Sequence, residues 1–265
     1  MGKLYQSICS FSNLSKTFDF LWKKNRRPGP DGISLYDLLP IRDSYIRELS
    51  SSLINGSYHP TKDVYLTKPY YPGATKILTY ACMNVREKLV EYAIKNYLYC
   101  WFDESMTDFC CAYRKRWGEK KVNELVTLYT SKGYIQYVSL DIKGFFKSID
   151  QDRLMDMLNA LDDDNLSLLI SDSLHFSHQC GIPSGHVLSP LLSNYYLNDL
   201  DWELAKRELK VIRYADNYCF AAKQYDQLED IIVQFKYLLQ DYNMLINDMK
   251  TRYIVAPKIW QDIIV

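Results

Sequence analysis

Hydrophobic and polar residues in the first half of the chain follow helical spacing, which is interrupted by one strand-like stretch. Apolar positions three and four residues apart predict four helices, over residues 14–24, 41–54, 85–101 and 119–130. Two β-rich runs, 64–68 and 76–80, flank a turn at 70–73 and predict a hairpin. Pro and Gly residues at 28–32 prevent regular structure after the first helix.

After Gly133 the pattern predicts short strands interspersed with helices. The strands are predicted at 134–140, 211–214, 218–222 and 252–256. The helices are predicted at 152–161, 165–173, 189–209 and 226–241. The order β-α-α-β-β-α-β, with the second and third strands forming a hairpin, is that of the split-βαβ, ferredoxin-like plan. The predicted fold class is therefore α+β with an antiparallel sheet.

The composition is that of an ordinary globular protein, with 48% hydrophobic and 24% charged residues. No apolar run approaches the ~18–20 residues that span a bilayer, so no membrane association is expected. The N-terminus lacks an apolar segment followed by a small-residue cleavage site, so no secretion signal is expected. The seven cysteines include no C-x-x-C pair, which indicates reduced thiols and a cytoplasmic protein.

Net charge is formally zero, but the two halves of the chain differ. Residues 1–132 carry 20 Lys and Arg against 13 Asp and Glu, whereas residues 133–265 carry 12 against 19. A basic half joined to an acidic half fits a protein that binds a polyanion with one part and metal ions with the other. The alternative interpretation is a chance asymmetry of solvated surfaces.

Two aspartates stand out by their position. Asp141 ends the first predicted strand after Gly133, and Asp216 lies in a tight turn between two short apolar strands. In a split-βαβ sheet these strands are neighbours, so the two carboxylates can approach within metal-bridging distance. Two carboxylates that close repel each other unless cations lie between them. A pair of Mg²⁺ ions held in this way catalyses in-line phosphoryl transfer. The alternative is that each aspartate is only a turn or cap residue.

Four segments in order resemble the palm motifs of bacterial reverse transcriptases. They are VSLDIKGFFKSID (138–150), GIPSGHVLSPLLSNYYLNDLD (181–201), VIRYADNYCFAAK (211–223) and LINDMKT (245–251). Upstream, NRRPGPDGIS resembles the opening motif of the group II intron-like branch. DVYLTKPYYPGATKILTY resembles the fingers hairpin that closes over the nucleotide. The resemblance covers roughly residues 25–251.

The resemblance implies a right-hand polymerase fold. Fingers would comprise residues 1–132, with the basic N-terminal helices and the nucleotide-closing hairpin, and the palm would comprise residues 133–265. The chain stops 14 residues after Thr251, which leads us to expect a thumb that is lacking or very short. In that case a structured RNA or a protein partner would supply the clamp on the duplex.

The resemblance also implies roles for single residues at the predicted catalytic centre. Asp141 and Asp216 would hold the metal ions, assisted by the backbone carbonyl of Ile142. Asn217 would complete the catalytic turn. Phe146 falls at the position of the aromatic ring that excludes a 2′-hydroxyl and so selects dNTPs over NTPs. The alternative is that Phe145 and Phe146 are both core residues.

Further residues are implied to bind nucleotide and nucleic acid. Lys250 would lie near the departing pyrophosphate and donate a proton there. The implied nucleotide-binding residues are Lys68 and Lys76 on the hairpin and Pro183, Ser184 and Gly185 in the loop before the long helix. The implied phosphate contacts on the template side are Arg26, Arg27, Arg114, Lys115 and Arg116. For each cation, a solvated surface position is the alternative.

Three positions depart from the family pattern. Asn217 replaces the second aspartate of Tyr-Ala-Asp-Asp, which removes one negative charge and favours Mn²⁺ as an alternative to Mg²⁺. Ser184 replaces the usual glutamine of the Pro-Gln-Gly loop. Lys76 replaces an arginine and gives up its bidentate contact with phosphate.

The sequence therefore predicts an RNA-directed DNA polymerase that takes an RNA template, a DNA primer and dNTPs. Retron-type signatures are absent, and Ser189-Pro190 differs from the Ser-Gln of diversity-generating enzymes. A divergent enzyme of the group II-like or antiviral-defence branch remains by elimination. Two alternatives stay open: a catalytically impaired nucleic-acid-binding subunit, and a template-independent or protein-primed nucleotidyltransferase.

Overall fold

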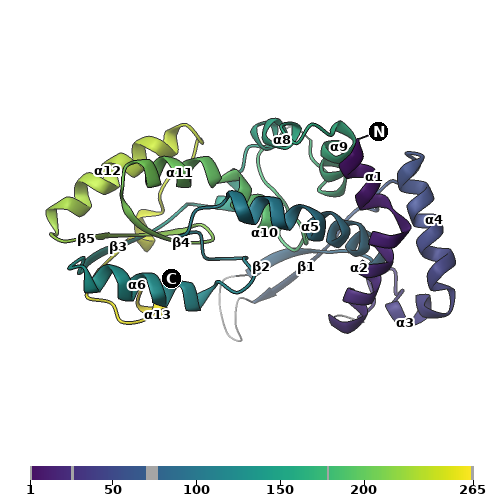
Figure 1. Ribbon diagram of the computed structural model, residues 1–265, viewed down its shortest axis with the longest axis horizontal. Coiled ribbons are helices and arrows are strands. Elements are labelled where there is room, and N and C mark those ends of the chain that lie inside the picture. Colours follow the sequence, from purple (N-terminus) through teal and green to yellow (C-terminus); the bar gives the residue numbers. More distant parts are fainter. Residues whose placement is uncertain (1, 25–26, 70–76, 178, 264–265) are drawn as a thin grey trace. The chain divides into compact units, whose positions relative to one another are not determined.

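The computed structural model describes residues 2–24, 27–69, 77–177 and 179–263 (Figure 1). The chain divides into two compact units. Unit 1 comprises residues 1–100 and 151–189, and unit 2 comprises residues 101–150 and 190–265. The predicted fingers and palm, divided at residue 132, are functional regions rather than compact units, and that division stays a prediction.

Unit 1 combines N-terminal helices, a two-stranded sheet and a pair of helices from the middle of the chain. Its elements are α1 (Lys3–Cys9), α2 (Phe11–Lys24), α3 (Leu35–Leu38), η1 (Leu39–Ile41), α4 (Arg42–Ile54), β1 (Val64–Pro69), β2 (Ile77–Cys82), the first part of α5 (Val85–Ser105), α8 (Gln151–Asn159) and α9 (Asp164–Ser173). Helix α2 buries one stripe, formed by Leu14, Thr17, Phe18 and Leu21. This spacing places the stripe on one helical face, which packs against α1 and α4.

The predicted hairpin is confirmed as strands β1 and β2, which pair antiparallel from Val64 opposite Cys82 to Pro69 opposite Ile77. Its predicted turn, 70–73, lies outside the described residues.

Unit 2 is built on a four-stranded antiparallel sheet with the order β4-β5-β3-β6. Its elements are α6 (Glu119–Ser131), β3 (Gln136–Asp141), α7 (Phe145–Ser148), α10 (Ser189–Tyr196), α11 (Asn198–Lys206), β4 (Lys210–Tyr214), β5 (Asn217–Ala222), α12 (Asp226–Gln240), η2 (Asp248–Lys250), β6 (Arg252–Val255) and α13 (Trp260–Ile263). The first strand lies beside the central hairpin, as the ferredoxin-like plan requires. The α+β prediction is confirmed.

Helices cover both faces of this sheet. In Figure 1, α11 and α12 lie on one side, and α6 and α13 lie on the other. On the first side, the ring of Phe235 in α12 lies 4.7 Å from that of Tyr218 and 5.0 Å from that of Phe220. On the second side, the Tyr137 hydroxyl donates to the backbone carbonyl of Val126 in α6, at 3.5 Å. Because both faces are covered, β5 is buried along its whole length.

One predicted element is corrected. The predicted helix over 189–209 is two helices, α10 and α11, separated at Leu197. Leu197 has a ψ of 0°, which departs from ideal helical geometry, while its amide still donates to the Ser193 carbonyl at 3.4 Å and its carbonyl accepts from the Asp201 amide at 3.0 Å. The short helices α1, α3, α7 and α13 were not predicted. Within the described parts of the chain, no helix is long and apolar enough to cross a membrane.

Candidate active site

The two predicted metal ligands meet at one end of the unit 2 sheet. Asp141 is the last residue of β3 and is 7% exposed. Asp216 lies in the two-residue turn between β4 and β5, where Ala215 has a left-handed φ of +57°. The amide of Ile142 donates to the backbone carbonyl of Asp216 at 3.2 Å. The sheet therefore places the backbones of the two aspartates side by side, as the predicted strand order required.

The Asp141 carboxylate has one cationic partner and one amide partner, both from the segment after α12. Lys250 Nζ lies 2.8 Å from Asp141 Oδ2, and Asn247 Nδ2 donates to Oδ1 at 3.3 Å. The amide of Asn247 also donates to the Asp141 carbonyl, at 2.7 Å. The predicted proton donor Lys250 thus lies in the acidic cluster, where it neutralises one of the two carboxylates.

Asn217 lies directly opposite Asp141 across the β3–β5 pair, so both side chains emerge on the same face of the sheet. Its Oδ1 accepts a hydrogen bond from Ser139 Oγ at 3.0 Å. The residue is 4% exposed, and its Nδ2 is buried and has no hydrogen-bond partner in the structure. An unpaired buried N–H donor is costly unless an acceptor such as water satisfies it. The replacement of aspartate therefore leaves an unfilled polar position beside Asp141.

The structure separates the two neighbouring phenylalanines of the first motif. Phe145 is 2% exposed and belongs to the core, whereas Phe146 is half-buried. Their rings meet edge to face at 5.7 Å. Both belong to the short helix α7, which follows Gly144 in the left-handed conformation. Phe146 is therefore the ring that remains accessible, as the sugar-selecting role requires.

In unit 1, the loop that contains Pro183, Ser184 and Gly185 lies against the end of β2. The amide of Ala81 donates to the carbonyl of Ser184 at 2.7 Å. Gly185 has a φ of +105°, and a Cβ there would lie 2.4 Å from the Ala81 carbonyl oxygen. Only glycine allows this close approach of the two backbones. The predicted nucleotide loop is thus fixed to the predicted nucleotide-closing hairpin.

A buried histidine holds the same loop and was not predicted. His186 Nδ1 lies 2.5 Å from Glu91 Oε1, and its Nε2 lies 2.8 Å from Asp63 Oδ2. Glu91 Oε2 accepts hydrogen bonds from the amides of Val187 and Leu188. Burial alone would lower the pKa of His186, but the hydrogen bonds and negative charges of Glu91 and Asp63 raise it above its ordinary value.

The stability of the protein should fall as pH rises through the raised pKa of His186. The protonated imidazole is favoured in the folded state, so its contribution is complete below the unfolded pKa and is lost above the folded one. The groups that face it are Asp63, Glu91 and, 3.9 Å from Asp63, His175. Thermal unfolding between about pH 6 and about pH 9 should show this slope in the wild type and in the exposed His59→Gln control. The slope should be reduced in His186→Gln, and an unchanged slope there would contradict the assignment.

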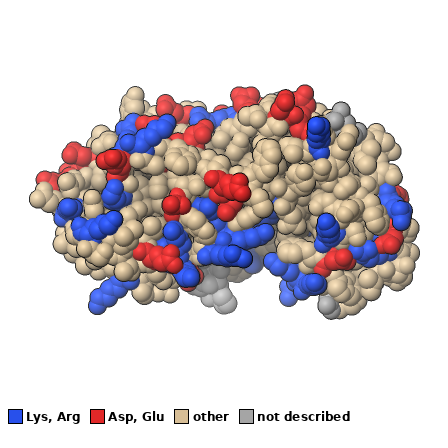
Figure 2. Space-filling model, in the orientation of Figure 1, with Lys and Arg blue, Asp and Glu red and all other residues tan. Residues whose placement is uncertain are grey.

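The predicted cations have different environments. Lys68 in β1 is exposed, and its Nζ lies 5.2 Å from the centre of the Tyr80 ring. Arg27, Lys115 and Arg116 are exposed, and Figure 2 shows Lys and Arg interspersed with Asp and Glu over the visible face. Arg26 and Lys76 lie outside the described residues.

Arg114 is different, because its side chain is only 5% exposed. It donates to Asp103 Oδ1 at 2.7 Å and to the backbone carbonyls of Asp103, Thr107 and Cys110. Its guanidinium also stacks on Trp117, 3.6 Å from the ring centre. These contacts use the donors that a phosphate would need. The structure therefore gives Arg114 an internal role, in place of the predicted phosphate contact.

The family of the chain follows from comparison with known proteins. The profile of the family described as "Reverse transcriptase (RNA-dependent DNA polymerase)" matches residues 68–261. The chain belongs to the reverse transcriptase family. The matched region contains Asp141, Asp216 and Lys250, and the family predicted from the motifs is confirmed.

The curated relatives of this reverse transcriptase domain are intron-encoded proteins. The group II intron-encoded protein LtrA of Lactococcus lactis subsp. cremoris is 26% identical over 181 residues, which cover 63% of this chain and 29% of that protein. The putative COX1/OXI3 intron 2 protein of Saccharomyces cerevisiae is 25% identical over 196 residues, or 68% of this chain and 22% of that protein. The chain thus spans less than a third of the length of these relatives.

Solved structures confirm the fold. A chain of a partial Cas6-RT-Cas1–Cas2 complex matches with a TM-score of 0.53 at 20% identity, over 90% of this chain and 43% of that one. Apo telomerase from Candida tropicalis matches with a TM-score of 0.52 at 11% identity, over 80% of this chain and 49% of that one. The reverse transcriptase domain therefore has the right-hand polymerase fold.

Proposed function

We propose that this chain is an RNA-directed DNA polymerase that transfers nucleotides from dNTPs to the 3′-hydroxyl of a DNA primer on an RNA template. The observation that carries the proposal is the meeting of Asp141 and Asp216 at one sheet end, within a chain of the reverse transcriptase family. In this proposal residues 1–132 act as fingers and residues 133–265 as palm.

The donor set at the sheet end fits divalent metal ions. Asp141 and Asp216 supply carboxylates, the Ile142 carbonyl supplies a neutral oxygen, and Asn217, whose amide oxygen accepts from Ser139, lies on the same face as Asp141. Among the described residues, no group of three or more His, Cys, Asp or Glu side chains could hold a metal. A site with few carboxylates suits Mg²⁺, or Mn²⁺, completed by water and substrate phosphates. When bound, these ions would activate the primer 3′-hydroxyl and stabilise the leaving pyrophosphate.

Further residues in each unit by itself support the proposed function. Lys250 forms an ion pair with Asp141, and we propose that its side chain passes a proton to the departing pyrophosphate. Gly185 holds the nucleotide loop against β2, and Ser184 accepts the Ala81 amide there. We propose that Lys68, Lys76 and Pro183 complete the nucleotide site, and that Arg26, Arg27, Lys115 and Arg116 contact nucleic-acid phosphates.

Phe146 should set the preference for dNTPs. Replacing Phe146 with alanine should raise the use of NTPs relative to dNTPs by about 100-fold, because the half-buried ring no longer opposes a 2′-hydroxyl. Single-nucleotide incorporation with paired dNTP and NTP measures this ratio. The matched control is Phe145→Leu, in the buried neighbour, which should lower stability and leave the ratio unchanged. An equal change of the ratio in both variants would contradict the assignment.

The proposed function is tested by extension of a labelled DNA primer on an RNA template, with Mg²⁺ and Mn²⁺ in separate reactions. Template-dependent dNTP incorporation is the expected result. Incorporation in a lane without template would instead assign a template-independent nucleotidyltransferase. No incorporation under any condition, with nucleic acid still bound, would overturn the assignment of the isolated chain as a polymerase.

A second candidate function is a catalytically impaired nucleic-acid-binding subunit. The missing charge at Asn217 and the pairing of Asp141 with Lys250 favour it. Both candidate functions are compatible with a protein or structured RNA partner that clamps the duplex. A chain of similar fold has been solved in a Cas6-RT-Cas1–Cas2 complex. Adding candidate partners to the primer-extension reaction separates a partner-dependent enzyme from a binding subunit.

A further inference from the structure

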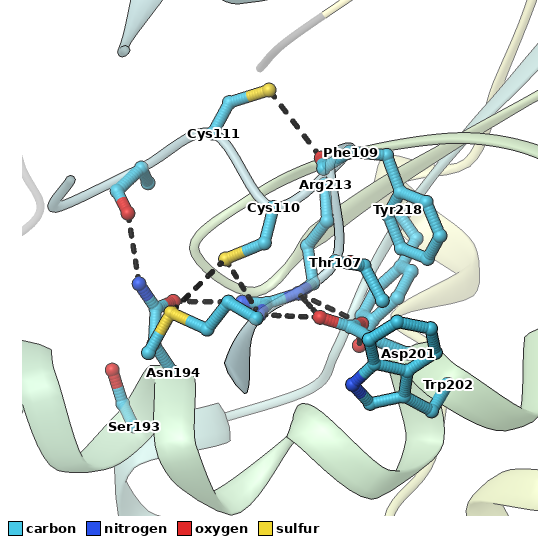
Figure 3. A network of polar contacts seen from close by, with 12 residues as sticks. Thr107, Phe109, Cys110, Cys111, Ser193, Asn194, Asp201, Trp202, Arg213 and Tyr218 are labelled. Carbon is cyan, nitrogen blue, oxygen red and sulfur yellow. Dashed lines mark hydrogen bonds and ion pairs between the residues drawn. The ribbon is translucent and has the colours of Figure 1, made fainter. Parts of the chain in front are cut away.

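A fully buried arginine lies three residues before Asp216. Arg213 occupies β4, and its side chain is 0% exposed. A buried charge is expensive unless it is paired and its remaining donors are hydrogen-bonded. Although burial opposes the charged form, the carboxylate of Asp201 raises the pKa of Arg213 above its ordinary value. The guanidinium is therefore charged, and each of its nitrogens has partners within unit 2 (Figure 3).

One side of the guanidinium is held by an acid. Nε donates to both oxygens of Asp201, at 2.9 and 2.8 Å, and Nη2 donates to Oδ2 at 2.6 Å. The Tyr218 hydroxyl donates to the same carboxylate at 2.9 Å. Nη2 also lies 2.9 Å from Cys110 Sγ, and burial raises the pKa of that thiol to about 11, so it stays neutral. These contacts fix the arginine within the core.

The other side faces the catalytic turn. Nη1 donates to Asn194 Oδ1 at 2.8 Å and to the backbone carbonyl of Ala215 at 3.0 Å. Ala215 has a left-handed φ of +57°, a backbone conformation that residues other than glycine rarely adopt. The next carbonyl, that of Asp216, is held by the amide of Ile142. Both peptide carbonyls that flank the Asp216 Cα atom are therefore hydrogen-bonded, one by a charged donor.

We propose that Arg213 is a positioning residue for catalysis: through the Ala215 carbonyl it fixes the strained turn that presents the Asp216 carboxylate to a divalent metal ion. This proposal rests on the proposed function, in which Asp216 is a metal ligand. A core arginine that only stabilises the fold would need the Asp201 pair but not the contact with Ala215. The pair with Asp201 can be replaced by apolar side chains that keep the core filled, so the contact with Ala215 can be removed without leaving a buried charge unpaired.

The separating variant is Arg213→Met with Asp201→Leu and Tyr218→Phe. It removes the cation, its acid and the hydroxyl on that acid together, so no buried charge is left unpaired and the fold can persist. The contact with Ala215 is lost. We expect Mn²⁺ affinity without nucleotide, measured by electron paramagnetic resonance, to fall at least tenfold, and kcat for dNTP incorporation to fall more than KM changes.

A second variant and a control guard against misfolding. Arg213→Lys keeps the charge near Asp201 but lacks the planar fork that serves both Asp201 and Ala215, so it should also bind Mn²⁺ at least tenfold more weakly. Cys110→Ala removes a contact on the side away from the turn and should leave Mn²⁺ affinity unchanged. Circular dichroism and thermal unfolding show which variants are folded.

The outcomes distinguish the two proposals. If Asp216→Asn binds Mn²⁺ as tightly as the wild type, the proposed metal site itself is wrong. If Asp216→Asn loses binding while a folded Arg213 variant keeps the wild-type affinity, the metal site stands and the positioning role of Arg213 is overturned. Loss of binding in Asp216→Asn and in a folded Arg213 variant, with Cys110→Ala unaffected, supports the role of Arg213.

Discussion

Replacing Asp141 with asparagine should reduce template-directed dNTP incorporation by about 1,000-fold. The substitution keeps the shape of the side chain but removes one of the two carboxylates at the sheet end. Metal ions in such sites stabilise transition-state charge by several kcal/mol, and ~1.4 kcal/mol corresponds to a factor of ten in rate. Gel-resolved single-turnover extension of a labelled primer measures the loss.

Folding should be little affected by the Asp141 substitution. The substitution removes the ion pair between Asp141 and Lys250. The Lys250 side chain is 39% exposed, and ion pairs with a solvent-accessible partner contribute about 1 kcal/mol or less to the free energy of unfolding. Asparagine can still accept the hydrogen bond from Asn247. The matched control is Asp230→Asn, on the exposed surface of α12, which should keep full activity. Wild-type activity in Asp141→Asn would refute the assignment of Asp141.

Restoring the second carboxylate by Asn217→Asp should have two opposite effects. Without metal, the new carboxylate is buried beside Asp141 on the same face of the sheet, so repulsion and desolvation should lower the free energy of unfolding by about 1–3 kcal/mol. With metal, the added charge should raise Mg²⁺ affinity about tenfold, or ~1.4 kcal/mol. Activity with Mg²⁺ should rise relative to activity with Mn²⁺.

Thermal unfolding with and without Mg²⁺, together with calorimetric titration, tests both effects of Asn217→Asp. The control Asn165→Asp adds the same charge to the exposed first turn of α9. It should change the free energy of unfolding and the Mg²⁺ affinity very little. If Asn217→Asp loses stability but gains no metal affinity, the Asn217 position does not face the metal site. If it gains affinity without gaining activity, the impaired-subunit candidate is favoured.

The order of elements and the catalytic motifs could be predicted from the sequence. Apolar spacing along α2 is a local signal, because it reports which face of the helix is buried. The β-rich run at β3 is also a local signal, although the strand proves to be buried on both faces. The turn between β4 and β5 placed Asp216 next to Asp141 once the strand order was known. The break at Leu197 was missed, since the apolar pattern continues through it and only the backbone angle changes.

The partners of the polar side chains were decided by the tertiary structure alone. Lys250 reaches Asp141 across 109 positions, and His186 reaches Glu91 across 95. In the sequence each of these residues is an isolated polar position, and nothing local distinguishes a surface lysine from one that neutralises a buried carboxylate. The internal role of Arg114 was missed for the same reason, and Arg213 was not singled out, although a charge within the strand pattern of β4 is a local signal.

The physical reason lies in the range of the forces concerned. Hydrophobic periodicity, turn residues and glycine conformations act over a few neighbouring residues, so they determined the elements. The family followed from the resemblance of the ordered motifs, and the acidic pair from the predicted strand order. The pairing of buried charges depends on which elements exclude water from one another, as where β4, α10 and α11 surround Arg213. Packing therefore decided which cations remain exposed for a substrate and which support the fold.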